Sequence, residues 1–483
     1  MSKHPQWALK YKKKGTELRL IKGKYYLYEI TSKWNPEKKR SQKVTLRLLG
    51  KITENEGFVE SEKLKLKKGQ DIYDNISVKE YGLSSFIENN LVEYIELLKK
   101  HFPKHWKFII ASAYARLAFQ SPLKKYQYHY SKSFLSETYS NIGLSSSMIT
   151  KKMKEIGNNR QQILDFFAEF KVGNDNILFD GTDLFSNSNK MRFPEKSKTK
   201  KGTYDNIVNL MLVFSLKLKQ PVYYRIMPGN IKDISSFKLC LTESGISNAT
   251  IIGDKGFYSA SNLEKLDNDQ LKYIIPLRRN NYMIDYSPIK KGDLKEFDGY
   301  FIYEKKIIWY YQKIHNGKKV IVYKNDELKN EEIMDFLSRC ETLPEKYDTQ
   351  NFYKKQHTFG TFAVITNLDD NQTAESIYIL YKSRNQIEIM IDVFKNIFNA
   401  DKTYMQDDQA IEGWMFINII VMHWYYKILL HLQVQNLNSK YSPKDIINFL
   451  IDIKKIKIND KWYEDEITKK NKTIFDKIKL PIT

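Results

Sequence analysis

Cysteine is scarce in this sequence, and no spacing of cysteine or histidine suggests a metal site. The 483 residues include two cysteines, Cys240 and Cys340, which lie 100 positions apart. This spacing excludes a zinc-finger grouping and a disulfide framework, and it is typical of a protein from a reducing compartment. Among the eight histidines, His101 and His105 are four apart on an expected helix, but Pro103 lies between them. We therefore expect no zinc site.

The sequence also lacks an uninterrupted apolar segment that could span a membrane. The first residues, MSKHPQWALKYKKKG, contain no apolar stretch of the kind found in signal peptides. The most apolar long stretch, Trp414 to Val434, contains Asn418, His423 and Lys427. Because a membrane span needs about 20 mainly apolar residues, we interpret this stretch as a core helix. We expect a cytoplasmic protein with no membrane partner.

Arginine is also uncommon, yet the chain is strongly basic because lysine is abundant. Arginine supplies 11 of the 79 basic residues, against 57 acidic ones, and the net charge is +22. Such an excess favours a polyanionic partner, either nucleic acid or an anionic membrane surface. Enrichment in Lys, Tyr, Asn and Ile also follows from an AT-rich genome, so charge is a modest argument. With 42% hydrophobic residues, the chain is not disordered as a whole.

The first third of the chain divides into two regions of different periodicity. Residues 1–75 predict a small basic β-rich module, with strands that flank a turn. Residues 76–172 have helical periodicity and predict a helical domain, with DNA binding as one interpretation. Within it, two helices are expected to meet at Gly143, with Ser145 or Ser146 capping the second. This pattern fits a helix-turn-helix that reads DNA, although an ordinary helical hairpin is the more common structure.

The remainder predicts an α/β core that is interrupted by an insertion. Residues 173–278 read as strands and helices in the order β-β-β-α-β-α-β, which predicts a mixed sheet covered by helices. Residues 279–362 contain aromatic and β-branched runs and predict a β-rich insertion. Residues 363–434 predict the second part of the core, and residues 435–483 a helical C-terminal tail.

Two aspartates follow apolar strands in the first part of the core. Asp180 is expected at the end of the strand NILFD, and Asp254 at the end of ATIIGD. Side chains at the carboxyl ends of neighbouring strands lie at one edge of a sheet, where ligand sites collect. Carboxylate oxygens are the ligands that Mg²⁺ prefers. The alternative is that each aspartate caps a turn or the following helix.

A predicted helix in the second part carries four polar groups on one face. Tyr381, Arg384, Glu388 and Lys395 have offsets of 0, 3, 7 and 14 residues, which fall within a fan of about 60° on an ideal helix. A solvated face with an ordinary Arg384–Glu388 ion pair is the alternative. The apolar residues elsewhere on this helix indicate that it is packed, so its charged face should point into a polar site.

Together, the three carboxylates match the requirements of phosphodiester chemistry. Two metal ions about 3.5–4 Å apart stabilise the attacking and the leaving oxygen of an in-line displacement. Asp180, Asp254 and Glu388 could hold such a pair, while arginine and lysine bind the phosphates. Asp183 and Asp392 lie near these residues and are weaker candidates for the same ligand positions.

These motifs resemble a known family. The motifs Asp180-Gly-Thr182, Asp254-Lys-Gly256-Phe257 and Tyr381-x2-Arg384-x3-Glu388-x6-Lys395 are similar to those of DDE insertion-sequence transposases of the insertion-sequence-four type. That type is marked by a Tyr-Arg-Glu-Lys signature, whose spacing matches at all four positions. The resemblance covers about Asn176 to Leu430. It implies a ribonuclease-H-like core with a β-rich insertion before the third acidic residue.

The resemblance also implies an activity and a set of ligands. Asp180, Asp254 and Glu388 would bind two Mg²⁺ ions, with Mn²⁺ as a substitute, and Tyr381, Arg384 and Lys395 would contact phosphates at the transposon end. Such enzymes hydrolyse the 3′ strand and then transfer it to target DNA, as homodimers on paired ends. Two alternatives remain at this point: a nuclease that cuts without joining, and a domesticated DNA-binding protein that has lost catalysis.

Overall fold

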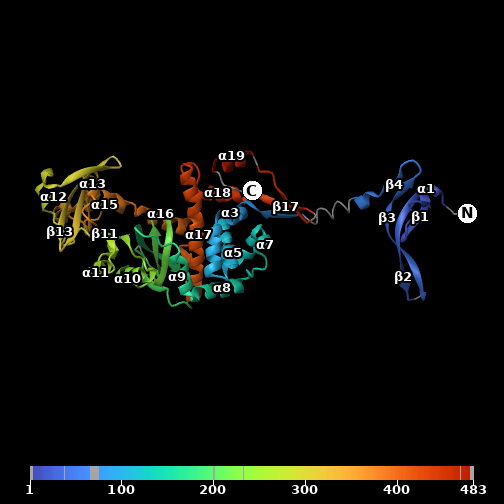
Figure 1. Ribbon diagram of the computed structural model, residues 1–483, viewed down its shortest axis with the longest axis horizontal. Helices are drawn as coiled ribbons and strands as arrows, with labels where there is room; N and C mark the ends of the chain where they lie inside the picture. The colour runs from blue at the N-terminus through green and yellow to red at the C-terminus, as the bar shows by residue number, and fades with distance from the viewer. Residues whose placement is uncertain are drawn as a thin grey trace. The chain divides into compact units, whose positions relative to one another are not determined.

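The protein consists of two compact units (Figure 1). The computed structural model describes residues 4–36, 38–65, 76–199, 202–231, 233–458, 460–467 and 469–478. One unit contains Met1–Glu80 and Ile453–Ile467, and the other contains Tyr81–Asp452 and Thr468–Thr483. The helices expected within residues 76–172 therefore belong to the same compact unit as the central sheet, and the expected C-terminal tail contributes to both units.

The first unit contains an antiparallel sheet in the order β1-β2-β3-β4. A small core packs a short helix against this sheet and contains Ala8, Leu18, Leu27 and Ile52. This agrees with the strands expected in the first 75 residues, of which 66–75 lie outside the described part. The elements are α1 (Gln6–Leu9), β1 (Thr16–Ile21), β2 (Lys24–Asn35), β3 (Arg40–Thr53) and β4 (Gly57–Glu60).

A second, three-stranded sheet in this unit joins distant parts of the sequence. β17 (Lys454–Ile458) lies between β5 (Ser77–Glu80) and β18 (Lys461–Glu464), and it is antiparallel to both. The expectation of a helical tail is therefore wrong for residues 454–464. The alternation of lysine and isoleucine in this segment has a period of two, which is the pattern of a strand. Two helices of the second unit flank it in sequence, α18 (Pro443–Ile451) and α19 (Lys469–Ile478).

The second unit is built on a mixed sheet with the strand order β9-β8-β6-β10-β11. β8 is antiparallel to both β6 and β9, whereas β10 is parallel to β6 and β11 is parallel to β10. Apart from the additional short strand β7, which pairs with β8, this is the expected order β-β-β-α-β-α-β and the expected ribonuclease-H-like α/β core. The elements are β6 (Asp175–Ser186), β7 (Glu195–Lys198), β8 (Tyr204–Ser215), β9 (Gln220–Pro228), α10 (Asp233–Ser244), β10 (Ala249–Ile252), α11 (Ala260–Asn268) and β11 (Lys272–Pro276).

The insertion extends this sheet instead of forming a separate domain. β15 is antiparallel to both β11 and β14, so the order continues as β15-β14-β13-β12. The β-rich expectation for residues 279–362 is incomplete, because α13 and α14 also form there. α13 buries Phe336 alone among its residues, and such a weak apolar pattern does not signal a helix. The elements are α12 (Ser287–Lys291), β12 (Gly299–Tyr303), β13 (Lys306–His315), β14 (Lys318–Asn325), α13 (Asp326–Thr342), α14 (Thr349–Lys355) and β15 (Thr361–Thr366).

A group of helices surrounds α17 (Asp408–Val434), as Figure 1 shows. This helix is long and apolar enough to cross a membrane, but most of it is buried inside the protein. It is a core helix, as the polar residues within it indicated. The helices that precede the sheet are α3 (Gly82–Asn90), α4 (Val92–His101), α5 (Trp106–Phe119), α6 (Tyr126–Ser131), α7 (Leu135–Thr138), α8 (Ser146–Asn158) and α9 (Arg160–Ala168).

The expected helix-turn-helix around Gly143 is only half formed. Ser145 caps α8 as expected, because its side chain accepts a hydrogen bond from the backbone N–H of Met148 at 3.4 Å. The helix before Gly143, however, is α7, which has four residues. A single turn has too little buried surface to act as the first helix of such a motif.

Two glycines allow α8 and α17 to approach each other closely. A Cβ atom at Gly157 would lie 1.9 Å from the carbonyl oxygen of Gln409, and one at Gly413 would lie 2.1 Å from that of Met153. These obstacles are backbone atoms of the facing helix, so they cannot turn away as a side chain would. Larger residues would force the two helices apart.

Alanine at position 413 should therefore destabilise the protein. We expect Gly413→Ala to lower the free energy of unfolding by about 2–3 kcal/mol, because the helices must separate to admit the methyl group. Gly143→Ala is the matched control, since its Cβ would lie 3.5 Å from the side chain of Met148, an ordinary contact. Urea unfolding followed by circular dichroism measures both. Equal stability of the two variants would contradict the close packing.

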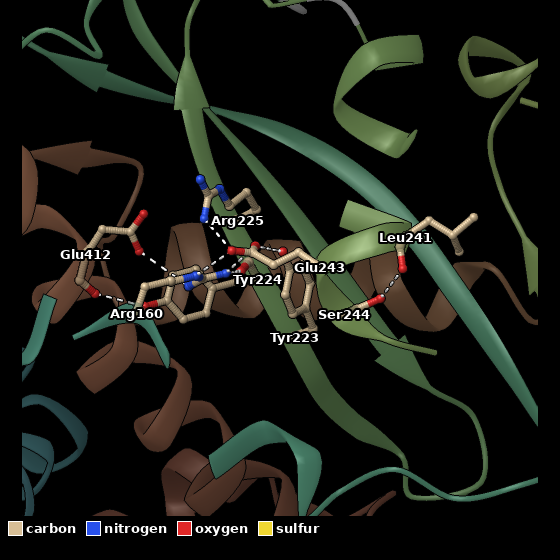
Figure 2. Close-up of polar contacts among 8 residues, drawn as sticks. All are labelled: Arg160, Tyr223, Tyr224, Arg225, Leu241, Glu243, Ser244 and Glu412. Atoms are coloured by element: carbon tan, nitrogen blue, oxygen red, sulfur yellow. Dashed lines mark hydrogen bonds and ion pairs between the residues drawn. The ribbon is translucent and has the colours of Figure 1, made fainter. Parts of the chain in front are cut away.

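A buried ionic network links the helices to the sheet, with Arg160 of α9 lying between Glu243 of α10 and Glu412 of α17 (Figure 2). The Arg160 guanidinium lies 3.1 Å from Glu243 and 3.5 Å from Glu412, and it donates to the backbone oxygen of Tyr224 at 2.6 Å. Arg225 of β9 also pairs with Glu243, at 2.7 Å. Burial raises the pKa of Glu412, although Arg160 and Arg225 act in the opposite direction. Arg160 therefore compensates two carboxylates with little access to water.

Removal of this guanidinium should be costly. We expect Arg160→Met to lower the free energy of unfolding by about 3 kcal/mol, because Glu412 loses its ion pair and Glu243 keeps only its pair with Arg225. Arg192→Met is the control, since Arg192 pairs with Asp408 while 86% of its side chain is exposed, and such pairs contribute about 1 kcal/mol or less. Chemical denaturation of both variants tests the difference. A loss at Arg160 no greater than at Arg192 would contradict the role of the network.

Candidate active site

The register of the central sheet places Asp180 and Asp254 at the same level. β6 and β10 are parallel, and Leu178 pairs with Ile252. Asp180 follows Leu178 by two residues on β6, and Asp254 follows Ile252 by two residues beyond the end of β10, so the two aspartates lie side by side. Asp180 is not at the end of its strand as expected. β6 continues to Ser186 because β8 pairs with it as far as Phe185.

Backbone N–H groups fix one oxygen of each aspartate. Asp180 Oδ1 accepts a hydrogen bond from the N–H of Gly181 at 2.9 Å, and Asp254 Oδ1 accepts one from the N–H of Lys255 at 2.7 Å. Asp254 also caps the short 3₁₀ helix Lys255–Phe257, so the capping alternative is correct in part. Asp180 is 7% exposed. A nearly buried carboxylate requires a positive partner.

The segment that carries the third carboxylate is less regular than expected. It consists of α15 (Ala374–Lys382), α16 (Asn385–Asp392) and a π-helical turn (Val393–Ile397). Between the helices the backbone winds more tightly, with N–H to oxygen bonds from Arg384 to Tyr381 and from Ile387 to Arg384. The ideal 100° per residue therefore does not apply from Tyr381 to Lys395. The prediction that Tyr381, Arg384, Glu388 and Lys395 share one face of a regular helix is therefore wrong.

Arg384 nevertheless lies among the three carboxylates. Its guanidinium is 3.1 Å from Asp180 Oδ2, and it also pairs with Glu388 one turn along α16. Burial lowers the pKa of Arg384, but the charges of Asp180 and Asp254 outweigh this and raise it overall. The side chains of Arg384 and Asp180 are 11% and 9% exposed, whereas that of Glu388 is 53% exposed. The site therefore has an enclosed side at β6 and an open side at Glu388.

Tyr381 closes the site beside Asp254. Its ring packs on Phe362 of β15, with 4.6 Å between the ring centroids. Burial raises the pKa of Tyr381 to about 12, and its hydroxyl also experiences the charges of Arg384 and Asp254. Asp254 and Tyr381 line a cleft of about 670 Å³, together with Lys255, Arg278, Arg279 and Glu332. The lining therefore contains three cationic and two acidic side chains.

The region that contains these residues matches a known protein family. Residues 173–424 match the family model described as the transposase DDE domain, which is 252 of the 483 residues. The chain belongs to this transposase family. Among solved structures, it is similar to a piggyBac transposase synaptic complex with hairpin DNA, at 11% identity and a TM-score of 0.40, over 71% of this chain and 69% of that one. No curated protein matches the chain in sequence.

Five of the six residues expected at the site lie near one another: Asp180, Asp254, Tyr381, Arg384 and Glu388. Lys395 is half-buried in the π-helical turn, and its place in the site rests on the resemblance. The two alternative ligands are less suitable. Asp183 is three residues beyond Asp180 on the same strand, so the alternation of side chains directs it to the other face of the sheet. Asp392 accepts a hydrogen bond from Asn396 at 2.5 Å.

Arg279 lies outside the sequence motifs that indicated the site. The structure places it at the wall of the cleft, where it pairs with Glu332 at 2.8 Å and donates to the backbone oxygen of Thr361 at 3.0 Å. Glu332 comes from α13 in the insertion. Because the sequence gave no sign of that helix, it gave no sign of this pair.

The side chains at this site are of the type that binds a divalent cation. Asp180, Asp254 and Glu388 supply the carboxylate oxygens that Mg²⁺ prefers. Within the described part of the chain, no three Asp, Glu, His or Cys side chains are grouped closely enough to share one ion. Arg384 instead compensates the carboxylates, and three negative charges with one positive charge leave −2 at the site. A divalent cation would balance that remainder.

The role of Arg384 can be tested through stability. We expect Arg384→Ala to lower the free energy of unfolding by about 3 kcal/mol in EDTA, because the nearly buried Asp180 would lose the guanidinium that lies 3.1 Å from its Oδ2. Adding Asp180→Asn should restore part of this loss, since it removes the uncompensated charge.

Arg339→Ala is the control for this measurement. Arg339 forms a similar i,i+4 pair with Asp335, but both side chains are about half exposed, so the loss should stay below about 1 kcal/mol. Urea titrations of the single and double variants compare these values. A double variant less stable than Arg384→Ala would contradict the pairing.

Proposed function

We propose that this protein is a transposase that cleaves the ends of its own insertion sequence and joins them to target DNA. The observation that carries the proposal is the grouping of Asp180, Asp254 and Glu388 around Arg384, within a chain of the transposase DDE family. We assign it to the insertion-sequence-four type because of the Tyr-Arg-Glu-Lys spacing.

The three carboxylates would hold two Mg²⁺ ions, with Mn²⁺ as a substitute. When bound, such ions activate a water molecule and stabilise the charge that develops on the phosphate oxygens. The half-exposed Glu388 is the ligand on the open side, where DNA can approach. Asp180 lies within β6, and Asp254 caps the short 3₁₀ helix after β10.

Tyr381, Arg384 and Lys395 would bind phosphates of the transposon end. Arg384 Nε is buried and, within the described residues, has no hydrogen-bond partner. A buried donor without an acceptor is costly, and a phosphate oxygen would satisfy it. The Tyr381 hydroxyl stays protonated at neutral pH, since its pKa is about 12, and can donate to the same group. Lys255, Arg278 and Arg279 extend the cationic surface along the cleft.

The proposed reaction has two stages on double-stranded DNA. Water first hydrolyses the 3′ strand at each transposon end, and the new 3′-OH then attacks a phosphodiester of the target. Two ends must be handled together, so we propose a homodimer on paired ends. An enzyme with this substrate would act in the cytoplasm, at the nucleoid of a prokaryotic cell.

A joining assay separates this function from the two alternatives. The full-length protein is incubated with Mg²⁺, a supercoiled target plasmid and a labelled duplex that carries the inverted repeat next to the gene. A transposase transfers label to the plasmid, whereas a nuclease shortens the duplex without transfer. A domesticated binding protein does neither.

The assignment of the third carboxylate is tested by neutral substitution. We expect Glu388→Gln to reduce Mg²⁺-dependent cleavage of the terminal duplex by at least about 1000-fold, because a ligand charge is lost (about 4 kcal/mol of transition-state stabilisation). Asp392→Asn is the control, since it removes a carboxylate four residues further along the same segment. Cleavage is followed on denaturing gels. Activity retained by Glu388→Gln, or lost equally in both variants, would refute the assignment.

A further inference from the structure

The hairpin of β2 and β3 extends beyond the core of the first unit as a two-stranded ribbon, visible in Figure 1. The small core of this unit is reached by Leu27 on β2 and Ile52 on β3. Further toward the tip, both faces of the ribbon are exposed, at Thr31 to Trp34 on β2 and at Val44 to Leu46 on β3. A strand pair that packs against protein on neither face needs another reason for its length. At about 3.3 Å per residue, the exposed part from residue 31 to 35 is about 15 Å long.

The positive charge of the ribbon loses its carboxylate partners toward the tip. Near the base, Arg47 pairs with Glu29 and Lys43 pairs with Glu17, both at 2.6 Å. Within the described part of the chain, no acidic side chain pairs with Lys33, Lys38 or Arg40. Residues 31–43 contain five basic residues and one acidic residue, Glu37. The tip is therefore complementary to a polyanion.

The two faces of the ribbon have different chemistry. The register pairs Lys33 with Gln42, and Asn35 with Arg40, so one face combines two cations with two amides. The Asn35 amide donates to Gln42 at 3.0 Å, which orients these groups. Trp34 lies on the opposite face and is 62% exposed. Arginine, lysine and amides are the side chains that hydrogen-bond to base edges, and an exposed aromatic ring can pack against sugars and methyl groups.

We propose that the β2–β3 ribbon enters the major groove of duplex DNA. Two strands lie about 4.8 Å apart, so with their side chains they fit a groove about 12 Å wide and exceed one of about 6 Å. Lys38 and Arg40 at the tip contact phosphates, and Trp34 becomes covered by the DNA. The inference takes DNA as the partner from the proposed function. It concerns a unit that does not contain the catalytic carboxylates, so it is separately testable.

The test measures how salt weakens binding of the full-length protein to a labelled 30-base-pair duplex, in EDTA, by fluorescence anisotropy. Each phosphate that is neutralised contributes about 0.9 to the slope of log affinity against log salt. We expect Lys38→Ala/Arg40→Ala to reduce the magnitude of this slope by about 1.8. Lys63→Ala/Lys65→Ala removes two exposed charges from the short helix 62–65 of the same unit and should leave the slope unchanged.

Two further measurements complete the test. Addition of duplex should change the tryptophan emission of the wild-type protein, and Trp34→Phe should lose most of that change. The measurements are made in EDTA, where no Mg²⁺-dependent cleavage takes place, so a failure of the proposed chemistry leaves this result standing. Circular dichroism confirms that the variants are folded, as expected for exposed positions.

Three outcomes would overturn the proposal. One is an equal change of slope in the two double variants. Another is an emission change that persists in Trp34→Phe. The third is binding to phosphatidylserine vesicles that depends on Lys38 and Arg40 while the DNA slope does not, which would make a membrane the partner.

Discussion

The candidate active site depends on a balance of charge among Asp180, Asp254, Glu388 and Arg384, because partly buried carboxylates repel one another. Asp180 lies on β6, Asp254 lies two residues after the end of β10, and Glu388 lies on α16. In a medium less polar than water their repulsion is strong unless a cation lies among them. Arg384 provides one positive charge from the segment that also supplies Glu388. Its guanidinium therefore links the first part of the core, through Asp180, to the second part, through Glu388, although the insertion separates these two parts in sequence.

The surrounding scaffold holds these parts by two other close contacts. The backbones of α8 and α17 approach through Gly157 and Gly413, and Arg160 joins α9 to both α10 and α17. α10 packs against the sheet that carries Asp180, through Phe237 and Phe179. The helices before the sheet are thus part of the body that positions the aspartates.

Local patterns predicted much of this structure, and contacts between distant residues account for what they missed. The strand order of the core followed from alternation and from apolar runs, and the grouping of five site residues followed from motif spacing. The continuation of β6 past Asp180 depends on pairing with β8, which no local pattern contains. α13 exposes most of its surface, so its apolar signal is weak. The tight turn at Arg384 and the π-helical turn at Lys395 change the helical angle without any glycine or proline to mark them.

The pairing of β5 with β17 has a consequence for the order of biosynthesis. Almost all of the second unit lies between these two strands in sequence, so β5 must wait for more than 370 residues to be translated before its neighbour emerges. At 5–20 residues per second this delay is roughly 20–75 seconds. Most of the large unit therefore has time to fold before the three-stranded sheet can be completed, with α19 still to follow. A gene shortened to end before β17 would lose this closure together with α19, and it would keep every residue of the carboxylate site.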